Sequence, residues 1–206
     1  GGGSGSGSGG YSQIAKLTAD DAAADDNLGY GVAIDGDFVV AGARELYYGD
    51  DPETGSAYVF RTTDGGVTYG QVAKLTADDA AADDEFGRSV AIDGDTVVIG
   101  SLYDDDGGSY SGAAHVFRTT DGGATYDELA KLTASDAAEG DMFGWSVAID
   151  GGTIVVGTPY DDDAGLTSGS AYVFLTTDGG ATYGQVAKLT ADDAASNDQF
   201  GVSVAI

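Results

Sequence analysis

The chain repeats one long sequence unit, and this repeat constrains its fold more than any other feature. Ala15-Lys16-Leu17-Thr18 returns at Ala73-Lys74-Leu75-Thr76, Ala130-Lys131-Leu132-Thr133 and Ala187-Lys188-Leu189-Thr190, at spacings of 58, 57 and 57 residues. A regular period of this length indicates one supersecondary unit copied in tandem, so the fold has to be interpreted one repeat at a time.

Each repeat predicts four strands. In the second copy, residues 88–92 alternate between apolar and polar side chains, and Asp93-Gly94 then forms a tight hairpin turn. Residues 96–99 form a second strand that is apolar on both faces. Residues 113–117 and 125–132 supply the third and fourth strands after turns rich in Asp and Gly. The unit is therefore predicted to be a four-stranded antiparallel meander.

A strand that is apolar on both faces has to be covered on both sides. Stacking successive four-stranded sheets around a centre provides this cover, as in a β-propeller. The sequence therefore predicts an all-β fold, a propeller-like array of four-stranded antiparallel blades. A linear β-solenoid is the alternative, although its repeats are usually shorter and its strands pair in parallel.

The repeats divide the chain into predicted parts. Three full blades are expected at about residues 28–75, 86–132 and 143–189, with a lone strand at each end, 11–17 and 200–206. Residues 1–10 contain only Gly and Ser and are predicted to be a flexible linker. Unpaired end strands invite strand addition by a neighbouring copy, and head-to-tail contacts of that kind build rings or filaments.

The charge of the chain excludes some classes of partner. Thirty-five acidic residues face eight basic ones, for a net charge of −27. Nucleic acids and anionic membranes need clustered Lys or Arg, so neither is expected as a partner. No apolar run approaches the length of a membrane span, so no membrane insertion is expected.

Two motifs of the repeat support a family resemblance. Phe86-Gly87-Arg88-Ser89-Val90-Ala91, followed by Val97-Val98-Ile99-Gly100, resembles the FG-GAP repeat of integrin-α-type propellers. The Phe-Gly pair recurs as Phe143-Gly144 and Phe200-Gly201, and Gly157-Thr158-Pro159 is the best copy of the GAP element. The resemblance implies a non-enzymatic adhesion or assembly protein located outside the cell or on its surface.

Many FG-GAP repeats carry a calcium loop between the first two strands. Here that link is only Ile92-Asp93-Gly94-Asp95 and its equivalents, which are too short to supply six to eight oxygen ligands. The calcium site of the family is therefore not expected in this chain.

The second motif resembles the Asp-box, with Thr in place of Ser and Tyr in place of Trp. It reads Thr62-Thr63-Asp64-Gly65-Gly66-Val67-Thr68-Tyr69 and returns at 119–126 and 176–183. In that family the box shapes the hairpin between the third and fourth strands of a blade. Sialidases carry the box too, but they need an arginine cluster that this chain does not supply, so a degraded sialidase-like hydrolase is a minor alternative.

The only histidine, His115, replaces Tyr58 and Tyr172 and is interpreted as a packing variant.

Positions that vary between the copies are the candidates for ligand binding. The residue after the Phe-Gly pair and the loop between the second and third strands both differ from copy to copy. Residues on such loops often bind ligands, and aromatic rings beside acids can stack on sugars or cap a protein partner. The alternative is drift of surface loops. The predicted ligand-binding residues are Tyr30, Tyr47, Tyr48, Arg88, Tyr103, Trp145 and Tyr160.

Two aspartate triplets, at 104–106 and 161–163, are candidates for weak Ca²⁺ binding. Consecutive side chains of an extended segment point to opposite sides, so the candidate ligands are Asp104, Asp106, Asp161 and Asp163. A solvated, salt-adapting surface is the alternative. No other cofactor is expected. The lysine of each repeat is expected to pair with nearby acids.

The sequence therefore predicts a non-enzymatic extracellular structural or adhesion protein, assembling into a homo-oligomer, fibre or sheath through its end strands. The alternative is a calcium-assisted module that binds a glycan or a cell-surface protein.

Overall fold

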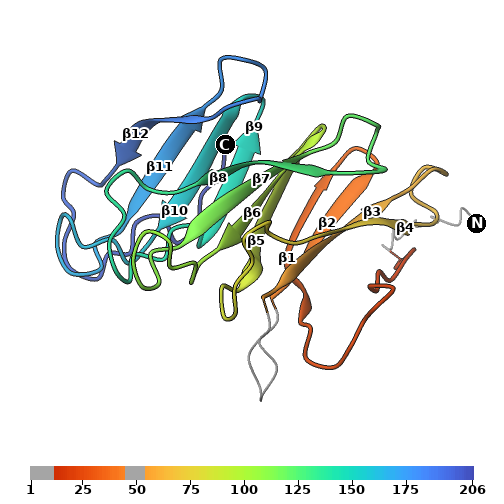
Figure 1. Cartoon of the computed structure of the whole chain (residues 1–206), viewed down its shortest axis with the longest axis horizontal. Coiled ribbons are helices and arrows are strands. Elements are labelled where there is room, and N and C mark those ends of the chain that lie inside the picture. The colour runs from red at the N-terminus through yellow and green to blue at the C-terminus, as the bar shows by residue number, and fades with distance from the viewer. Residues whose placement is uncertain (1–11, 45–53) are drawn as a thin grey trace, which may run out of the picture.

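The structure is a computed structural model that describes residues 12–44 and 54–206. Over these residues the chain forms three four-stranded antiparallel sheets, which we call blades 1, 2 and 3 (Figure 1). Blade 1 contains β1 (Leu28–Asp35), β2 (Phe38–Ala43), β3 (Ser56–Arg61) and β4 (Gly70–Leu75). Blade 2 contains β5 (Phe86–Asp93), β6 (Thr96–Ser101), β7 (Ala113–Arg118) and β8 (Asp127–Leu132). Blade 3 contains β9 (Ser146–Asp150), β10 (Thr153–Thr158), β11 (Ser170–Leu175) and β12 (Gly184–Leu189). The predicted all-β array of four-stranded antiparallel blades is confirmed.

The strands of each blade pair in chain order. The hairpin between β5 and β6 closes at the Asp93–Thr96 pair, and Gly94 in its turn has a φ of 54°. The fourth strand of blade 2 begins later than predicted, at Asp127, because Thr125 is held in the preceding hairpin by hydrogen bonds to Asp121. None of the described residues forms a helix capable of crossing a membrane.

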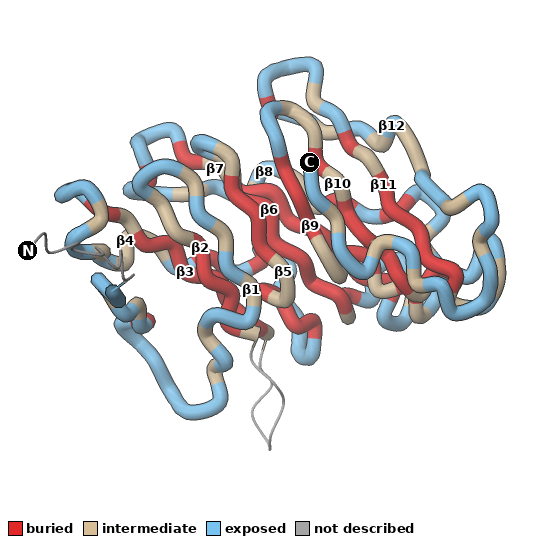
Figure 2. Tube along the Cα trace, turned by 180° about the vertical axis from the view of Figure 1, so that it is seen from behind, coloured by how far each residue is buried: buried red, intermediate tan, exposed pale blue. Residues whose placement is uncertain are grey.

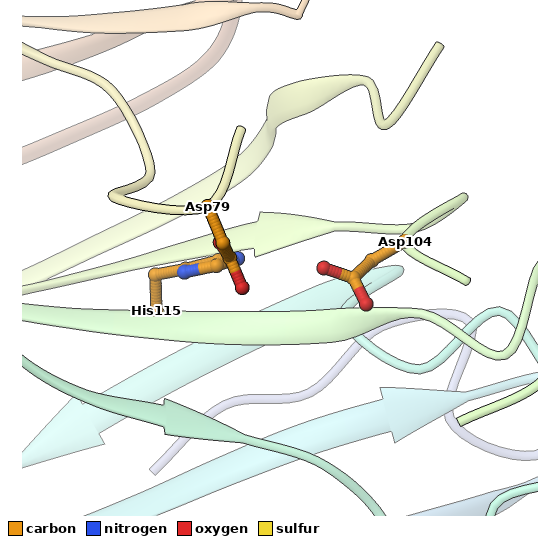
Figure 3. A group of neighbouring side chains, drawn as sticks. All are labelled: Asp79, Asp104 and His115. Atoms are coloured by element: carbon orange, nitrogen blue, oxygen red, sulfur yellow. The ribbon is translucent and has the colours of Figure 1, made fainter. Parts of the chain in front are cut away.

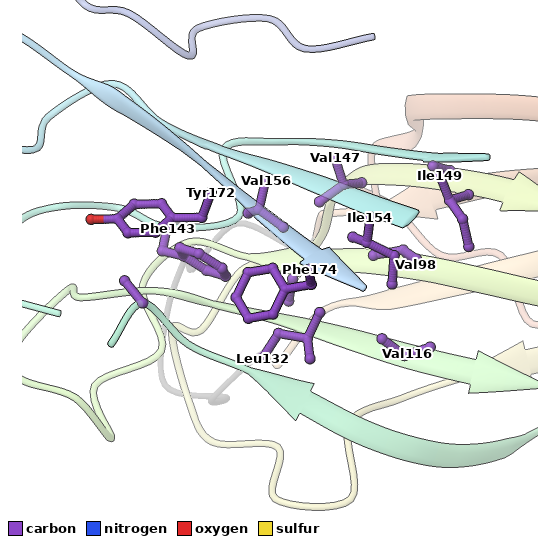
Figure 4. Close-up of a cluster of buried hydrophobic side chains, with 13 residues drawn as sticks. Val98, Val116, Leu132, Phe143, Val147, Ile149, Ile154, Val156, Tyr172 and Phe174 are labelled. Atoms are coloured by element: carbon purple, nitrogen blue, oxygen red, sulfur yellow. The ribbon is translucent and has the colours of Figure 1, made fainter. Parts of the chain in front are cut away.

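The blades pack face to face along the long axis of the molecule, with blade 2 between blades 1 and 3 (Figure 1). In the middle of blade 2, Val97, Val98 and Ile99 are fully buried. Both faces of β6 are therefore covered, one by each neighbouring blade (Figure 2). Between blades 2 and 3 the cluster combines Val116 and Leu132 with Phe143 and Phe174 (Figure 4).

Two glycines of each repeat let neighbouring blades approach closely. A Cβ added to Gly100 would lie 2.0 Å from the carbonyl oxygen of Gly144, and Gly157 meets Gly201 at the same distance. Gly144 itself has a φ of 91°, which side chains rarely adopt. The glycine of the second strand in one blade thus leaves room for the backbone of the Phe-Gly pair of the next repeat to pack against it.

The two lone end strands that the sequence predicts do not form strands in the described residues. Residues 12–17 and 201–206 are irregular, and neither segment pairs with a strand of the described part of the chain. Phe200 still makes the parallel bridge to Gly169 that Phe143 makes to Gly112. Phe200 is 38% exposed, however, whereas Phe143 is fully buried. The C-terminal segment therefore docks on blade 3 in the manner of a first strand. The predicted linker 1–10 lies outside the described residues.

Candidate functional site

A row of aromatic and arginine side chains crosses the three blades at the residue after the Leu-Gly pair and the first two Phe-Gly pairs. Tyr30 lies in β1, Arg88 in β5 and Trp145 just before β9. First strands of adjacent blades are neighbours, so these side chains meet. The guanidinium carbon of Arg88 lies 4.5 Å from the ring centroid of Tyr30 and 4.4 Å from that of Trp145.

Two further side chains extend this row. The guanidinium of Arg44 lies 4.8 Å from the Tyr30 ring, and the Tyr160 ring lies 5.5 Å from Trp145 at a tilt of 59°. We call Arg44, Tyr30, Arg88, Trp145 and Tyr160 the aromatic–arginine row. Stacked guanidinium and ring planes stabilise one another by about 0.5–1 kcal/mol per pair at exposed sites.

The buried carboxylate of Glu85 lies beside the two arginines of this row. Glu85 Oε2 lies 2.9 Å from Arg44 Nε. Burial raises the pKa of Glu85, and the charges of Arg44 and Arg88 oppose that rise. Tyr30 remains 47% exposed, so part of this aromatic residue is accessible to solvent beside the guanidinium groups. Such a surface can stack on a sugar ring or an aromatic side chain.

The structure brings together four of the predicted ligand-binding residues, namely Tyr30, Arg88, Trp145 and Tyr160. Tyr103 instead packs against Tyr110, with ring centroids 5.0 Å apart. Burial raises the pKa of Tyr103, and the charge of the Glu85 carboxylate adds to that rise. Tyr47 and Tyr48 lie outside the described residues. Sequence reasoning missed Arg44 and Glu85; the replacement of the GAP proline by arginine at position 44 was the available signal.

The predicted calcium ligands of blade 2 surround a lysine ammonium. Lys131 Nζ lies 2.7 Å from Asp79 Oδ2, 2.6 Å from Asp104 Oδ2 and 2.6 Å from Asp106 Oδ2. Asp104 is buried, whereas Asp105 and Asp106 are exposed. Burial by itself would lower the pKa of Lys131, but its hydrogen bonds to Asp104, Asp106 and Asp79 outweigh burial and raise the pKa.

Blade 3 repeats this arrangement. Lys188 Nζ contacts Asp136, Asp161 and Asp163, so the remaining predicted calcium ligands also face an ammonium group. The hydroxyl of Tyr172 lies 2.9 Å from Asp136 Oδ1 and 2.8 Å from Asp161 Oδ2, so its single proton is shared between the two carboxylates. In blade 1, Lys74 makes a single ion pair with Asp21 among the described residues.

The hairpin between the third and fourth strands uses its aspartate structurally. Asp64 Oδ1 accepts hydrogen bonds from the Val67 and Thr68 backbone, and Asp64 Oδ2 accepts one from the Thr68 hydroxyl at 2.6 Å. The side chain and backbone of Thr68 lower the pKa of Asp64 to about 2. Both oxygens of this carboxylate are therefore engaged in holding the turn.

Comparisons with known proteins agree with this architecture. A family model described as FG-GAP repeat matches residues 11–60, 69–117, 126–174 and 183–206. The crystal structure of the Saccharomyces cerevisiae Sqt1 is similar with a TM-score of 0.50 at 10% sequence identity, over 83% of this chain. This chain spans only 38% of that one, and a likeness at such low identity shows the fold alone. No curated protein sequence matches the chain.

Proposed function

Because the chain belongs to the FG-GAP repeat family, we propose that it is a non-enzymatic structural or adhesion protein outside the cell, which assembles head to tail through its two open blade faces. The supporting observation is a difference in burial between equivalent positions. Val90 and Ile92, which face blade 1, are each 9% exposed, whereas the equivalent Val32 and Ile34 of blade 1 are each 67% exposed.

The opposite end of the array is open in the same way. Leu75 and Leu132 lie between blades and are each 4% exposed, whereas the equivalent Leu189 of blade 3 is 43% exposed. Residues 200–206 cover this face only in part, leaving a hollow of about 310 Å³ lined by Val155, Leu189 and Phe200.

A second copy of the chain is the occupant that fits both faces. The open face of blade 1 is the counterpart of the face that blade 2 presents to blade 1. The open face of blade 3 is the counterpart of the face that blade 2 presents to blade 3. Because the two faces differ, their contact is heterologous, and repeated contacts build a ring or a filament.

The net charge of −27 sets the conditions for this assembly. Repulsion between copies opposes association at low ionic strength, and salt screens it. We therefore expect the weight-average mass, measured by light scattering, to rise with protein concentration in about 0.5 M NaCl and to rise less in about 0.02 M NaCl. Electron microscopy of the high-salt sample should show rings or filaments. A monomeric mass at every concentration in both salts would contradict the proposal.

A second candidate is ligand binding at the aromatic–arginine row, favoured by the exposure of Tyr30 beside two guanidinium groups. Trp145 is the only tryptophan, so its fluorescence reports on this row alone. Glycan-array binding that requires Ca²⁺, shifts the Trp145 emission and is lost in Arg88→Ala would support this candidate. Binding that is unchanged in Arg88→Ala would exclude it.

A further inference from the structure

One position of the repeat carries different chemistry in blade 2. The third strands of blades 1 and 3 carry Tyr58 and Tyr172, whereas β7 carries His115. The neighbouring fourth strand changes with it, because Glu128 replaces the glutamines at 71 and 185. Blade 2 alone combines the two substitutions.

Blade 3 shows what the tyrosine does at this position. The Tyr172 hydroxyl lies between two carboxylates, 2.9 Å from that of Asp136 and 2.8 Å from that of Asp161, and shares its one proton between them. The equivalent carboxylates of blade 2, each 57 residues earlier, belong to Asp79 and Asp104. An imidazole is shorter than a phenol, so His115 does not reach them as Tyr172 does. The ligand atoms of Asp79, Asp104 and His115 all lie within 4.8 Å of one another (Figure 3).

The two ring nitrogens of His115 have different surroundings. Nδ1 lies 2.8 Å from Glu128 Oε1, and because a carboxylate only accepts, Nδ1 donates its proton to it. Nε2 is buried, has no hydrogen-bond partner in the described part of the chain, and faces the two aspartates (Figure 3). His115 as a whole is fully buried. A histidine that donates from one nitrogen to a carboxylate and offers a lone pair from the other is the usual arrangement of a metal ligand.

We propose that Asp79, Asp104 and His115 bind one divalent first-row transition-metal ion, such as Zn²⁺, with Glu128 as the positioning residue for the imidazole. One imidazole nitrogen with two carboxylate oxygens suits these ions, whereas Ca²⁺ prefers an all-oxygen set. The ion lies where the tyrosine hydroxyl lies in blade 3.

Charge and access both favour a cation here. The carboxylates of Asp79, Asp104 and Asp106 surround the ammonium of Lys131, and a fourth carboxylate, that of Glu128, contacts His115 Nδ1. The side chain of Asp79 is 44% exposed, so an ion has a route from solvent. Ligand atoms around one such ion lie about 3–4 Å apart, so the exposed Asp79 side chain turns inward to complete the set.

Lys131 limits the affinity of this site. Its ammonium shares Asp79 and Asp104 with the ion and retains Asp106 when the ion binds. Blade 3 shows that a lysine and a second group can share these carboxylates, since Asp161 Oδ2 accepts from both Lys188 and Tyr172 at 2.8 Å.

Calorimetric titration with Zn²⁺, and Co²⁺ absorption in the visible range, test the site in the full chain. The titration buffer contains about 0.15 M NaCl and a few millimolar Ca²⁺. The Ca²⁺ occupies the weak carboxylate sites on the surface, so that Zn²⁺ bound there does not contribute. We expect one ion per chain. The double variant His115→Tyr with Glu128→Gln carries the side chains that blades 1 and 3 already accommodate, so it should fold. Its affinity should fall at least about 100-fold, and Glu128→Gln alone should lose about 10- to 100-fold.

The reverse exchange in blade 3 is the matched gain-of-function variant. Tyr172→His with Gln185→Glu should add a second bound ion, because Asp136 and Asp161 already occupy the equivalent positions. Binding of equal affinity in the wild type and the His115→Tyr, Glu128→Gln variant would overturn the proposal, since the ion would then lie elsewhere. The absence of saturable binding to the wild type would overturn it as well.

Discussion

Single residues of this repeat act through close contacts that cross from one element to the next. Lys188 links the linker before blade 3, through Asp136, to the loop after β10, through Asp161. Asp161 is 2% exposed, so its charge depends on that ammonium. Removal of one partner from a buried ion pair typically costs several kcal/mol, whereas exposed pairs contribute less than about 1 kcal/mol.

Lys188→Met should therefore lower the free energy of unfolding by roughly 3 kcal/mol, because it leaves the Asp161 carboxylate buried without a cation. Lys74→Met is the control, since the side chains of Lys74 and Asp21 are 39% and 49% exposed. Urea denaturation of both variants measures the difference. Equal losses in the two variants would contradict the prediction that the burial of Asp161 makes its lysine more important for stability.

The motif glycines give a second prediction at this scale. A methyl group at Gly100 would lie 2.0 Å from the Gly144 carbonyl oxygen, so Gly100→Ala has to push blades 2 and 3 apart. We expect a loss of about 3 kcal/mol in unfolding free energy, at the upper end of the usual cost of overpacking. Gly94→Ala, at a hairpin tip with a φ of 54° and open space around it, should cost only about 1 kcal/mol. A small effect of Gly100→Ala in the same denaturation experiment would argue against tight blade contact.

At the scale of elements, the linkers between blades carry a repeated turn. The backbone N–H of Ala138 donates to Asp141 Oδ2 at 2.8 Å, and the equivalent bonds end at Asp26, Asp84 and Asp198. Asp141 is 5% exposed, and burial raises its pKa to about 6, with the Asp161 charge adding to the rise. The linker between blades 2 and 3 thus holds an acid that is harder to ionise than in the unfolded chain.

This linker predicts a pH-dependent stability. Because the folded chain binds the Asp141 proton more tightly, its ionisation costs stability above about pH 6, and the cost disappears as the pH falls below about 4. Asp141→Asn keeps an acceptor for the Ala138 N–H and should raise the unfolding free energy by about 1–3 kcal/mol at pH 7.5. Below about pH 4 the gain should vanish. Asp198→Asn, at an exposed position with the same turn, is the control. A gain that is independent of pH would contradict this assignment.

The strands could be predicted from the sequence, whereas the side-chain clusters around Lys131 and His115 could not. Alternating residues and Gly-rich turns act locally, so three four-stranded blades could be predicted. The partners of Lys131 come from a linker about 50 residues earlier and a loop about 25 residues earlier, so no local pattern reveals them. The sequence alone favours a packing role for His115, because its neighbour Asp79 belongs to a distant linker that reaches β7 only in the folded chain.

At the scale of the whole molecule, each blade is stabilised by the faces of its neighbours. Equivalent side chains are buried inside the array and exposed at its ends, as the pairs Ile92 and Ile34, and Leu132 and Leu189, show. Assembly through two different faces has a specific consequence. A chain blocked on one face retains the other and can still form one junction.

Mixing two blocked variants tests head-to-tail assembly most directly. Ile34→Lys blocks the open face of blade 1, and Leu189→Lys blocks that of blade 3. Val67→Lys, at an exposed hairpin residue, is the control and should assemble like the wild type. In sedimentation equilibrium at high salt, each blocked variant alone should be monomeric, and their equimolar mixture should reach twice the monomer mass and no more. A mixture that stays monomeric, or a single blocked variant that still associates, would contradict assembly through these faces.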